Sequence, residues 1–155
     1  ASRAISFALA ENRAELVILN RQQEMDWAVE LAGNISQLSG KEVKAFELNE
    51  QNLRAALDDA DLLVNATSVG MSPDTSQTPV AKKLLKPGLV VFDVVYNPIK
   101  TRLLAEAGEA GAKTISGIDM LIWQGALAFE MWTGLKPPVE IMKLEAVKAL
   151  KGHED

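Results

Sequence analysis

The chain has 155 residues, of which 48% are hydrophobic and 24% charged, with a formal net charge of −5. This length fits one domain or a large part of one, and the negative charge argues against a nucleic-acid-binding face. The absence of cysteine excludes disulfides, thiol nucleophiles and thiolate metal sites. We find no apolar run of membrane-spanning length and no signal peptide, and we expect a cytoplasmic protein without a membrane partner.

Short apolar runs alternate with helical patterns along the chain. In chain order, the patterns predict a helix over 1–11, a strand over 15–19, a helix over 24–32, a strand over 43–46, a helix over 50–57, a strand over 62–64, a helix over 78–85, a strand over 89–95, a helix over 101–110, a strand over 113–115, and helices over 118–133 and 139–150. This alternation predicts an α/β fold with a Rossmann-type, doubly wound, mostly parallel sheet and helices on both faces.

Several residues carry signals for helix ends and for the core. Asn49 is a candidate cap for the helix over 50–57, and Ser116 and Asp119 have the spacing of a capping box. Three aromatic residues of the long apolar helix are expected in the core: Trp123, Phe129 and Trp132. The single histidine, His153, lies in a polar tail and is expected to be solvated rather than catalytic.

The start of the sequence differs from a complete Rossmann unit. Such a unit begins with a strand and a glycine-rich turn, whose amides hold a pyrophosphate at a helix N-terminus. Here the first residues, Ala1-Ser2-Arg3-Ala4, are already expected in a helix, and no G-x-G-x-x-G occurs. Either the fold is a different one, or the sequence starts just after that turn and the first strand is missing.

Small polar residues follow the strand over 62–64. They are Asn65, Thr67 and Ser68, and Gly70 comes directly after them. The residues past the carboxyl end of a parallel strand line the ligand crevice of an open α/β sheet. Taken alone, the segment fits a polar turn as well as a ligand-binding edge.

Asn20 and Arg21 directly follow the strand over 15–19. In a dinucleotide fold, an acidic residue at this place bonds the 2′-hydroxyl of NAD, and an arginine suits the 2′-phosphate of NADP. An exposed loop arginine is the alternative. Glu24 and Asp26 would repel a phosphate if they pointed inward, or face solvent as acids in the first helical turn.

Two further side chains are candidates for contact with a ligand. Tyr96 comes after the strand over 89–95 and before the turn at Asn97-Pro98, so its hydroxyl is expected near the carboxyl edge of the sheet. Gln124 interrupts an apolar helical stretch and shares a face with Met120. A buried glutamine needs hydrogen-bond partners, which a polar ligand or a backbone carbonyl can supply.

Together these segments resemble the C-terminal NADP-binding domain of the shikimate dehydrogenase family. The resemblance covers almost the whole chain and rests on four segments in the family's order: Asn20-Arg21, the run over 65–71, the run over 93–98 with Thr101, and the run over 117–126 that continues to Gly134. It implies that residues 1–155 form one NADP-binding domain. Helices within 117–150 would pack against it and toward an N-terminal substrate domain that this chain lacks.

The resemblance also implies roles for particular residues. It implies NADP as the cofactor, held by Ala1, Asn20, Arg21, Thr67, Ser68, Val94, Gly117 and Met120. Tyr96 and Gln124 would reach toward the substrate, and neither a catalytic residue nor a metal ligand would lie in this chain. The family reversibly reduces 3-dehydroshikimate to shikimate with NADPH, in aromatic amino-acid biosynthesis.

Two departures from the family leave alternatives open. The family often follows Asn-Arg with Thr and a second basic residue, whereas Gln22, Gln23 and Glu24 follow here, so a quinate or shikimate dehydrogenase that uses NAD is one alternative. The family's catalytic Lys and Asp lie in the absent domain, so we expect this chain alone to be inactive. A non-catalytic dinucleotide-binding module is the other alternative, and a homodimer is left open.

Overall fold

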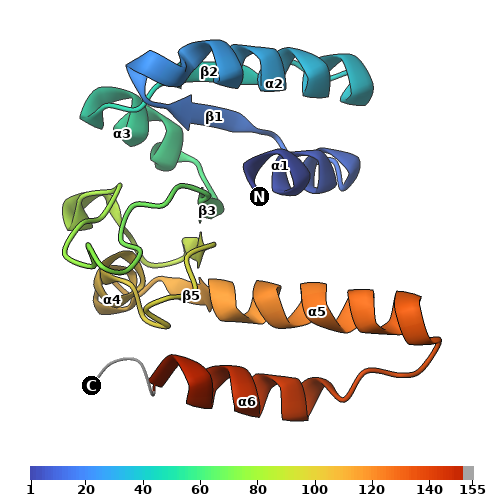
Figure 1. The fold of residues 1–155 in the computed structure, drawn as a ribbon. Coiled ribbons are helices and arrows are strands. Elements are labelled where there is room, and N and C mark those ends of the chain that lie inside the picture. Colours follow the sequence, from blue (N-terminus) through green and yellow to red (C-terminus); the bar gives the residue numbers. More distant parts are fainter. Residues whose placement is uncertain (152–155) are drawn as a thin grey trace. The chain divides into compact units, whose positions relative to one another are not determined.

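The computed structural model describes residues 1–151, so His153 lies outside the described part of the chain. The chain divides into two compact units, residues 1–60 and the residues from Asp61 onward (Figure 1). Among the described residues, no helix combines the length and apolarity that a membrane span requires.

The first unit has two parallel strands and three α-helices. In chain order they are α1 (Ser2–Glu11), β1 (Val17–Asn20), the 3-10 helix η1 (Gln22–Glu24), α2 (Met25–Ser39), β2 (Lys44–Glu47) and α3 (Glu50–Asp58). The strands pair from Val17 opposite Lys44 to Asn20 opposite Glu47. Helix α2 packs against both strands. Its buried residues are Ala28, Ala32 and Ile35.

The second unit has three parallel strands in the order β3-β4-β5. Its elements are β3 (Leu62–Asn65), the 3-10 helix η2 (Lys82–Leu84), β4 (Val90–Asp93), α4 (Arg102–Glu109), β5 (Lys113–Ser116), α5 (Gly117–Thr133) and α6 (Val139–Lys151). Helix α4 packs on β4 and β5. Val91 of the central strand and Leu103 of α4 are almost completely buried. The α/β class with parallel strands and flanking helices is confirmed, and the strands form two small sheets.

Most predicted elements are present, several of them with different ends. Helix α2 extends seven residues beyond the predicted end at Ala32 and stops at Gly40, whose φ of 69° is the left-handed conformation that ends helices. The segment over 78–85 forms only the 3-10 turn η2, in which Leu84 is buried. Asn49 caps α3 as predicted, because its side chain accepts a hydrogen bond from the Asn52 amide.

The prediction that the tryptophans of α5 lie in the core is wrong. Trp123 is 57% exposed and Trp132 is 83% exposed, and Phe129 is half-buried. The face of α5 that is buried carries Ile118, Ile122 and Ala126 instead. In Figure 1, α5 and α6 run side by side as a helical hairpin. This hairpin therefore exposes large apolar side chains of α5.

Candidate functional site

Three polar residues line up at the carboxyl edge of the second unit's sheet. The register places Asn65 of β3 opposite Asp93 of β4, and Asp93 opposite Ser116 of β5. Each is the last residue of its strand. This edge is where open parallel sheets bind their ligands. The strand order therefore brings the segments over 65–71, 93–98 and 116–120 to one edge of this sheet.

A buried cluster of hydrogen bonds stabilises the backbone at this edge of the sheet. Asp93, which is fully buried, accepts hydrogen bonds from Asn65 Nδ2 at 2.9 Å and from Thr101 Oγ1 at 2.6 Å. It also accepts one from the Val95 amide at 3.1 Å. Burial raises the pKa of the Asp93 carboxyl above its usual range, although these three hydrogen bonds act in the opposite direction. We call Asn65, Asp93 and Thr101 the buried polar cluster.

The turn after β3 uses the hydroxyl group of Thr67 internally. Thr67 Oγ1 donates to Asn65 Oδ1 at 2.7 Å and accepts from the Val69 amide at 3.1 Å. The hydroxyl proton of Thr67 is therefore already used in a hydrogen bond within the protein. Ser68 is exposed, and its hydroxyl makes no hydrogen bond within residues 1–151. Of the two predicted side chains, Ser68 is thus the one free to donate to a ligand.

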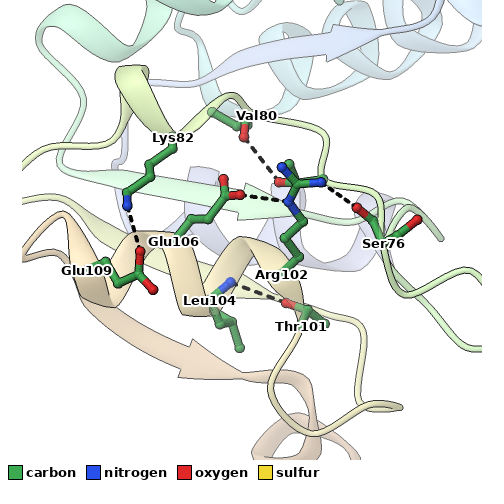
Figure 2. Close-up of polar contacts among 9 residues, drawn as sticks. Ser76, Val80, Lys82, Thr101, Arg102, Leu104, Glu106 and Glu109 are labelled. Carbon is green, nitrogen blue, oxygen red and sulfur yellow. Dashed lines mark hydrogen bonds and ion pairs between the residues drawn. The ribbon is translucent and has the colours of Figure 1, made fainter.

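The buried polar cluster is continuous with the start of α4. Thr101 Oγ1 accepts from the Leu104 amide at 3.3 Å and so caps the helix (Figure 2). Arg102 lies next to it, and donates to the Ser76 carbonyl at 2.6 Å and to Glu106 Oε1 at 2.7 Å. Arg102 thus connects the loop around residue 76 to α4, whose N-cap residue Thr101 also hydrogen-bonds Asp93.

An exposed ion pair joins η2 to the last turn of α4. Lys82 Nζ lies 2.6 Å from Glu109 Oε2, as Figure 2 shows. The hydrogen bond and the charge of each partner raise the pKa of Lys82 and lower that of Glu109. Both side chains are more than half exposed. The pair is therefore a surface contact, unlike the buried polar cluster, whose Thr101 caps the other end of α4.

Gly117 allows α5 to begin directly against the end of β4. A Cβ atom at this position would lie 2.2 Å from the Val94 carbonyl oxygen and 2.7 Å from that of Val95. No side chain fits at those distances. The sequence therefore has glycine where the backbone of α5 meets the strand end, and two predicted cofactor residues, Val94 and Gly117, lie together.

The predicted capping box of α5 is wrong. Ser116 is the N-cap residue, but its hydroxyl makes no cap hydrogen bond. It donates instead to the Ile99 carbonyl at 2.9 Å, and Asp119 pairs with Lys143 of α6 at 3.0 Å. Both side chains therefore bind segments far away in the sequence. A spacing rule for helix ends cannot foresee such partners.

The two predicted substrate residues lie on exposed surface of the second unit. Tyr96 is 41% exposed and precedes the cis peptide bond between Asn97 and Pro98. Gln124 is also exposed, so the premise that it is buried and needs internal partners is wrong. Met120, one turn earlier, is half-buried. The side chains of Tyr96 and Gln124 are thus both accessible to a ligand.

The predicted residues of the first unit lie in two places, at the end of β1 and at the start of α1. Asn20 is the last residue of β1, and Arg21 is exposed and pairs with Glu24. The Ala1 carbonyl accepts the Ile5 amide in the first turn of α1. A shallow hollow of about 410 Å³ in this unit lies between α2 and β2, and is lined by none of the predicted residues.

The exposed groups fit a dinucleotide by their chemistry. Arg21 has a planar multi-donor fork suited to a phosphate, and Ser68 is an exposed residue with a hydroxyl group. No group of three or more metal-ligating side chains occurs within residues 1–151. Sequence reasoning missed the roles of Asp93 and Thr101, and left the direction of Glu24 open. The available signal was an aspartate ending an apolar strand, where an unpaired carboxylate would be unfavourable.

The comparisons with known proteins agree with this arrangement. Residues 117–143 match the family described as Shikimate 5′-dehydrogenase C-terminal domain. The shikimate dehydrogenase (NADP(+)) of Methanosarcina mazei is 48% identical over 153 residues, which cover 97% of this chain and 53% of that protein. The match includes the segments that follow β1, β3 and β4.

Two solved structures have the same fold. A shikimate dehydrogenase in complex with NADP+ gives a TM-score of 0.85 at 36% identity, over 97% of this chain and 51% of that one. The quinate dehydrogenase of Corynebacterium glutamicum in complex with NAD gives 0.83 at 32% identity, over 96% and 51%. The chain spans about half the length of the proteins it matches. The chain is thus a relative of the shikimate dehydrogenases over about half of their length, and its residues 117–143 carry the match to their C-terminal domain.

Proposed function

We propose that this chain is the NADP-binding part of a shikimate dehydrogenase, which reversibly reduces 3-dehydroshikimate to shikimate with NADPH. One observation carries the proposal: 48% identity to a shikimate dehydrogenase (NADP(+)) over 97% of the chain. The polar edges after β1, β3 and β4 lie within this match. Because the chain spans about half of such a protein, the activity belongs to the longer protein.

We propose cofactor contacts for residues of each unit by itself. In the first unit, Ala1 would contact the pyrophosphate, and Asn20 and Arg21 the 2′-phosphate end of the adenosine. In the second unit, the contacts to ribose and nicotinamide would come from Thr67, Ser68, Val94, Gly117 and Met120. The exposed Ser68 hydroxyl supports this assignment. The bound nicotinamide would supply the hydride.

The substrate would be contacted by Tyr96 and Gln124, whose exposed side chains support this role. Reduction of a ketone also needs a proton donor close to the carbonyl oxygen. The chain spans about half the length of the shikimate dehydrogenases that it matches. We therefore place the proton donor in a substrate domain outside the printed sequence, and propose that this chain alone is inactive.

We further propose that α5 and α6 pack toward that substrate domain. The exposed Trp123, Leu127 and Met131 follow one another at intervals of four residues and so share one face of α5, which supports this arrangement, because contiguous exposed apolar groups mark interaction surfaces. We place the reaction in aromatic amino-acid biosynthesis and the protein in the cytoplasm. A homodimer is the assembly to test first, by analytical ultracentrifugation of the full-length protein.

The test is an assay of the full-length protein at alkaline pH with shikimate and NADP. We expect shikimate-dependent reduction of NADP, which is measured as the absorbance of NADPH. The printed chain, assayed alone, should give none. A full-length protein that reduces no NADP in the presence of shikimate would contradict the proposal.

A quinate or shikimate dehydrogenase that uses NAD is the second candidate function. Two observations favour it: the similarity to a quinate dehydrogenase in complex with NAD, and the pairing of Arg21 with an acid. Turnover of shikimate and of quinate, each with NADP and with NAD, separates the candidates. A larger kcat/KM for quinate with NAD would replace the first proposal by the second.

A further inference from the structure

The turn after β1 holds a carboxylate directly against the arginine that the proposed function assigns to the adenosine end. Arg21 Nη2 lies 2.6 Å from Glu24 Oε1, and Arg21 Nε lies 3.2 Å from Glu24 Oε2. Both carboxylate oxygens are therefore bound by one guanidinium group. The Arg21 side chain is 67% exposed and that of Glu24 is 26% exposed, so the pair is accessible to a ligand.

The backbone of the turn brings these two residues together. Asn20 Oδ1 accepts the Arg21 amide at 2.9 Å, and Asn20 Nδ2 donates to the Glu24 carbonyl at 3.0 Å. The Glu24 amide donates to the Arg21 carbonyl at 2.9 Å, which closes the turn of η1. Asn20 thus acts as a clamp around the turn, and Glu24 stays close to Arg21 independently of their charge attraction.

This geometry has opposite consequences for the two nicotinamide dinucleotides. A 2′-phosphate has to compete with the Glu24 carboxylate for the guanidinium and is repelled by its negative charge. A free ribose 2′-hydroxyl has no charge to be repelled. An acidic residue after the second strand is also the usual acceptor for the 2′-hydroxyl of NAD.

We propose that Glu24 is a specificity-determining residue, which lowers the preference of this protein for NADP(H) over NAD(H). The proposal rests on the proposed function, in which Arg21 faces the adenosine ribose. Arg21 favours binding of the 2′-phosphate, and the charge of Glu24 disfavours it. The two hydrogen bonds of Asn20 hold Arg21 and Glu24 next to each other, so both would act on the same ribose. The expected result is a protein that accepts both dinucleotides.

The experiment compares the full-length protein with its Glu24→Gln variant. Dissociation constants for NADPH and NADH are measured by fluorescence titration, and kcat/KM for NADP and NAD by the shikimate assay. Glutamine keeps the size of the side chain and removes its charge. We expect the NADP(H):NAD(H) preference to rise about fivefold in both measurements, as for the loss of one exposed charge interaction. The rise should diminish at high ionic strength.

Glu30→Gln is the matched control. Glu30 lies further along α2, is exposed and has no ion pair within residues 1–151, and the substitution makes the same change in net charge. A rise in the preference with Glu24→Gln but not with Glu30→Gln supports the proposal. An unchanged preference in Glu24→Gln, or an equal rise in both variants, overturns it. A wild-type protein that binds neither dinucleotide overturns the proposed function together with this inference.

Discussion

The two units place polar residues after their strands in contrasting ways. At the end of β1, Arg21 and Glu24 form an ion pair on the surface, whereas at the end of β4 the carboxylate of Asp93 is fully buried and bonded to Thr101. An exposed pair can exchange its partners for a ligand at little cost, because water already screens it. A buried cluster cannot, since breaking it leaves unpaired polar groups away from water. The first arrangement suits ligand selection, and the second suits the fixing of a backbone edge.

The largest expected effect is at Gly117, where the buried edge meets α5. Gly117→Ala would place a Cβ atom 2.2 Å from the Val94 carbonyl oxygen, so backbone has to move. We expect the free energy of unfolding to fall by at least about 3 kcal/mol, measured by urea denaturation of the full-length protein. Gly108→Ala in α4 is the control, because nothing lies within 4 Å of the added atom. That variant should be stabilised by about 0.5–1 kcal/mol, and equal losses in both would refute the clash.

Thr101→Val tests the buried polar cluster next. It removes the donor to Asp93 and the acceptor of the Leu104 amide, and leaves both groups without these bonds. We expect a loss of about 2–4 kcal/mol in unfolding free energy. Thr133→Val makes the same change at an exposed position, and should cost less than about 1 kcal/mol. Similar urea midpoints for the two variants would mean that burial does not distinguish the sites.

Arg21→Ala tests the exposed arrangement through its ligand. If Arg21 holds the 2′-phosphate, loss of this charge-assisted contact should weaken NADPH binding by roughly 1.5–3 kcal/mol, and NADH binding far less. Isothermal titration of the full-length protein with each dinucleotide measures both values. An equal loss for the two would show that the arginine does not recognise the phosphate.

The raised pKa of Asp93 predicts a smaller, pH-dependent effect. A carboxyl whose pKa is higher in the folded than in the unfolded state binds protons more tightly when folded. Its contribution to stability is therefore present below the ordinary aspartate pKa of about 4, and decreases as the pH rises through the raised value. Asp93→Asn lacks this titration. The difference in unfolding free energy, wild type minus variant, should be larger at pH 4 than at pH 7, and a difference that increases with pH would contradict the direction.

The ion pair between Lys82 and Glu109 should give the smallest effect. It has a distance of 2.6 Å, as short as the bond between Thr101 and Asp93, but both partners are exposed. Glu109→Gln should leave the urea midpoint at 0.15 M salt unchanged within error, since exposed pairs contribute little. A loss comparable to that of Thr101→Val would mean that short distance, rather than burial, determines the stabilisation.

The sequence allowed the strands to be predicted better than the polar contacts between them. The run over 62–64 identified β3 because buried parallel strands are continuously apolar. The bond between Asn65 and Asp93 was not predictable, since it joins residues 28 positions apart and depends on the register of β3 and β4. The Arg21 ion pair is local, yet sequence left the direction of Glu24 open, because a first-turn acid can face either side.

The same limit explains the error at Trp123 and Trp132. Helix α5 is apolar on nearly all sides, so periodicity could not tell which face the second unit covers. The covered apolar side chains are those of Ile118, Ile122 and Ala126. The location of the candidate residues at the strand ends was easier to predict, because the position of a residue after a parallel strand already places it at one edge of the sheet.

The exposure of the tryptophans determines how this protein can be observed in solution. All three, Trp27, Trp123 and Trp132, are more than half exposed. Indole emission at the surface already reflects water in the folded state, so unfolding should shift its wavelength little. Far-ultraviolet circular dichroism is therefore the appropriate probe for the denaturation experiments. The indole of Trp123 should instead respond when another surface covers its side of α5, so that its emission would serve as an optical reporter of docking.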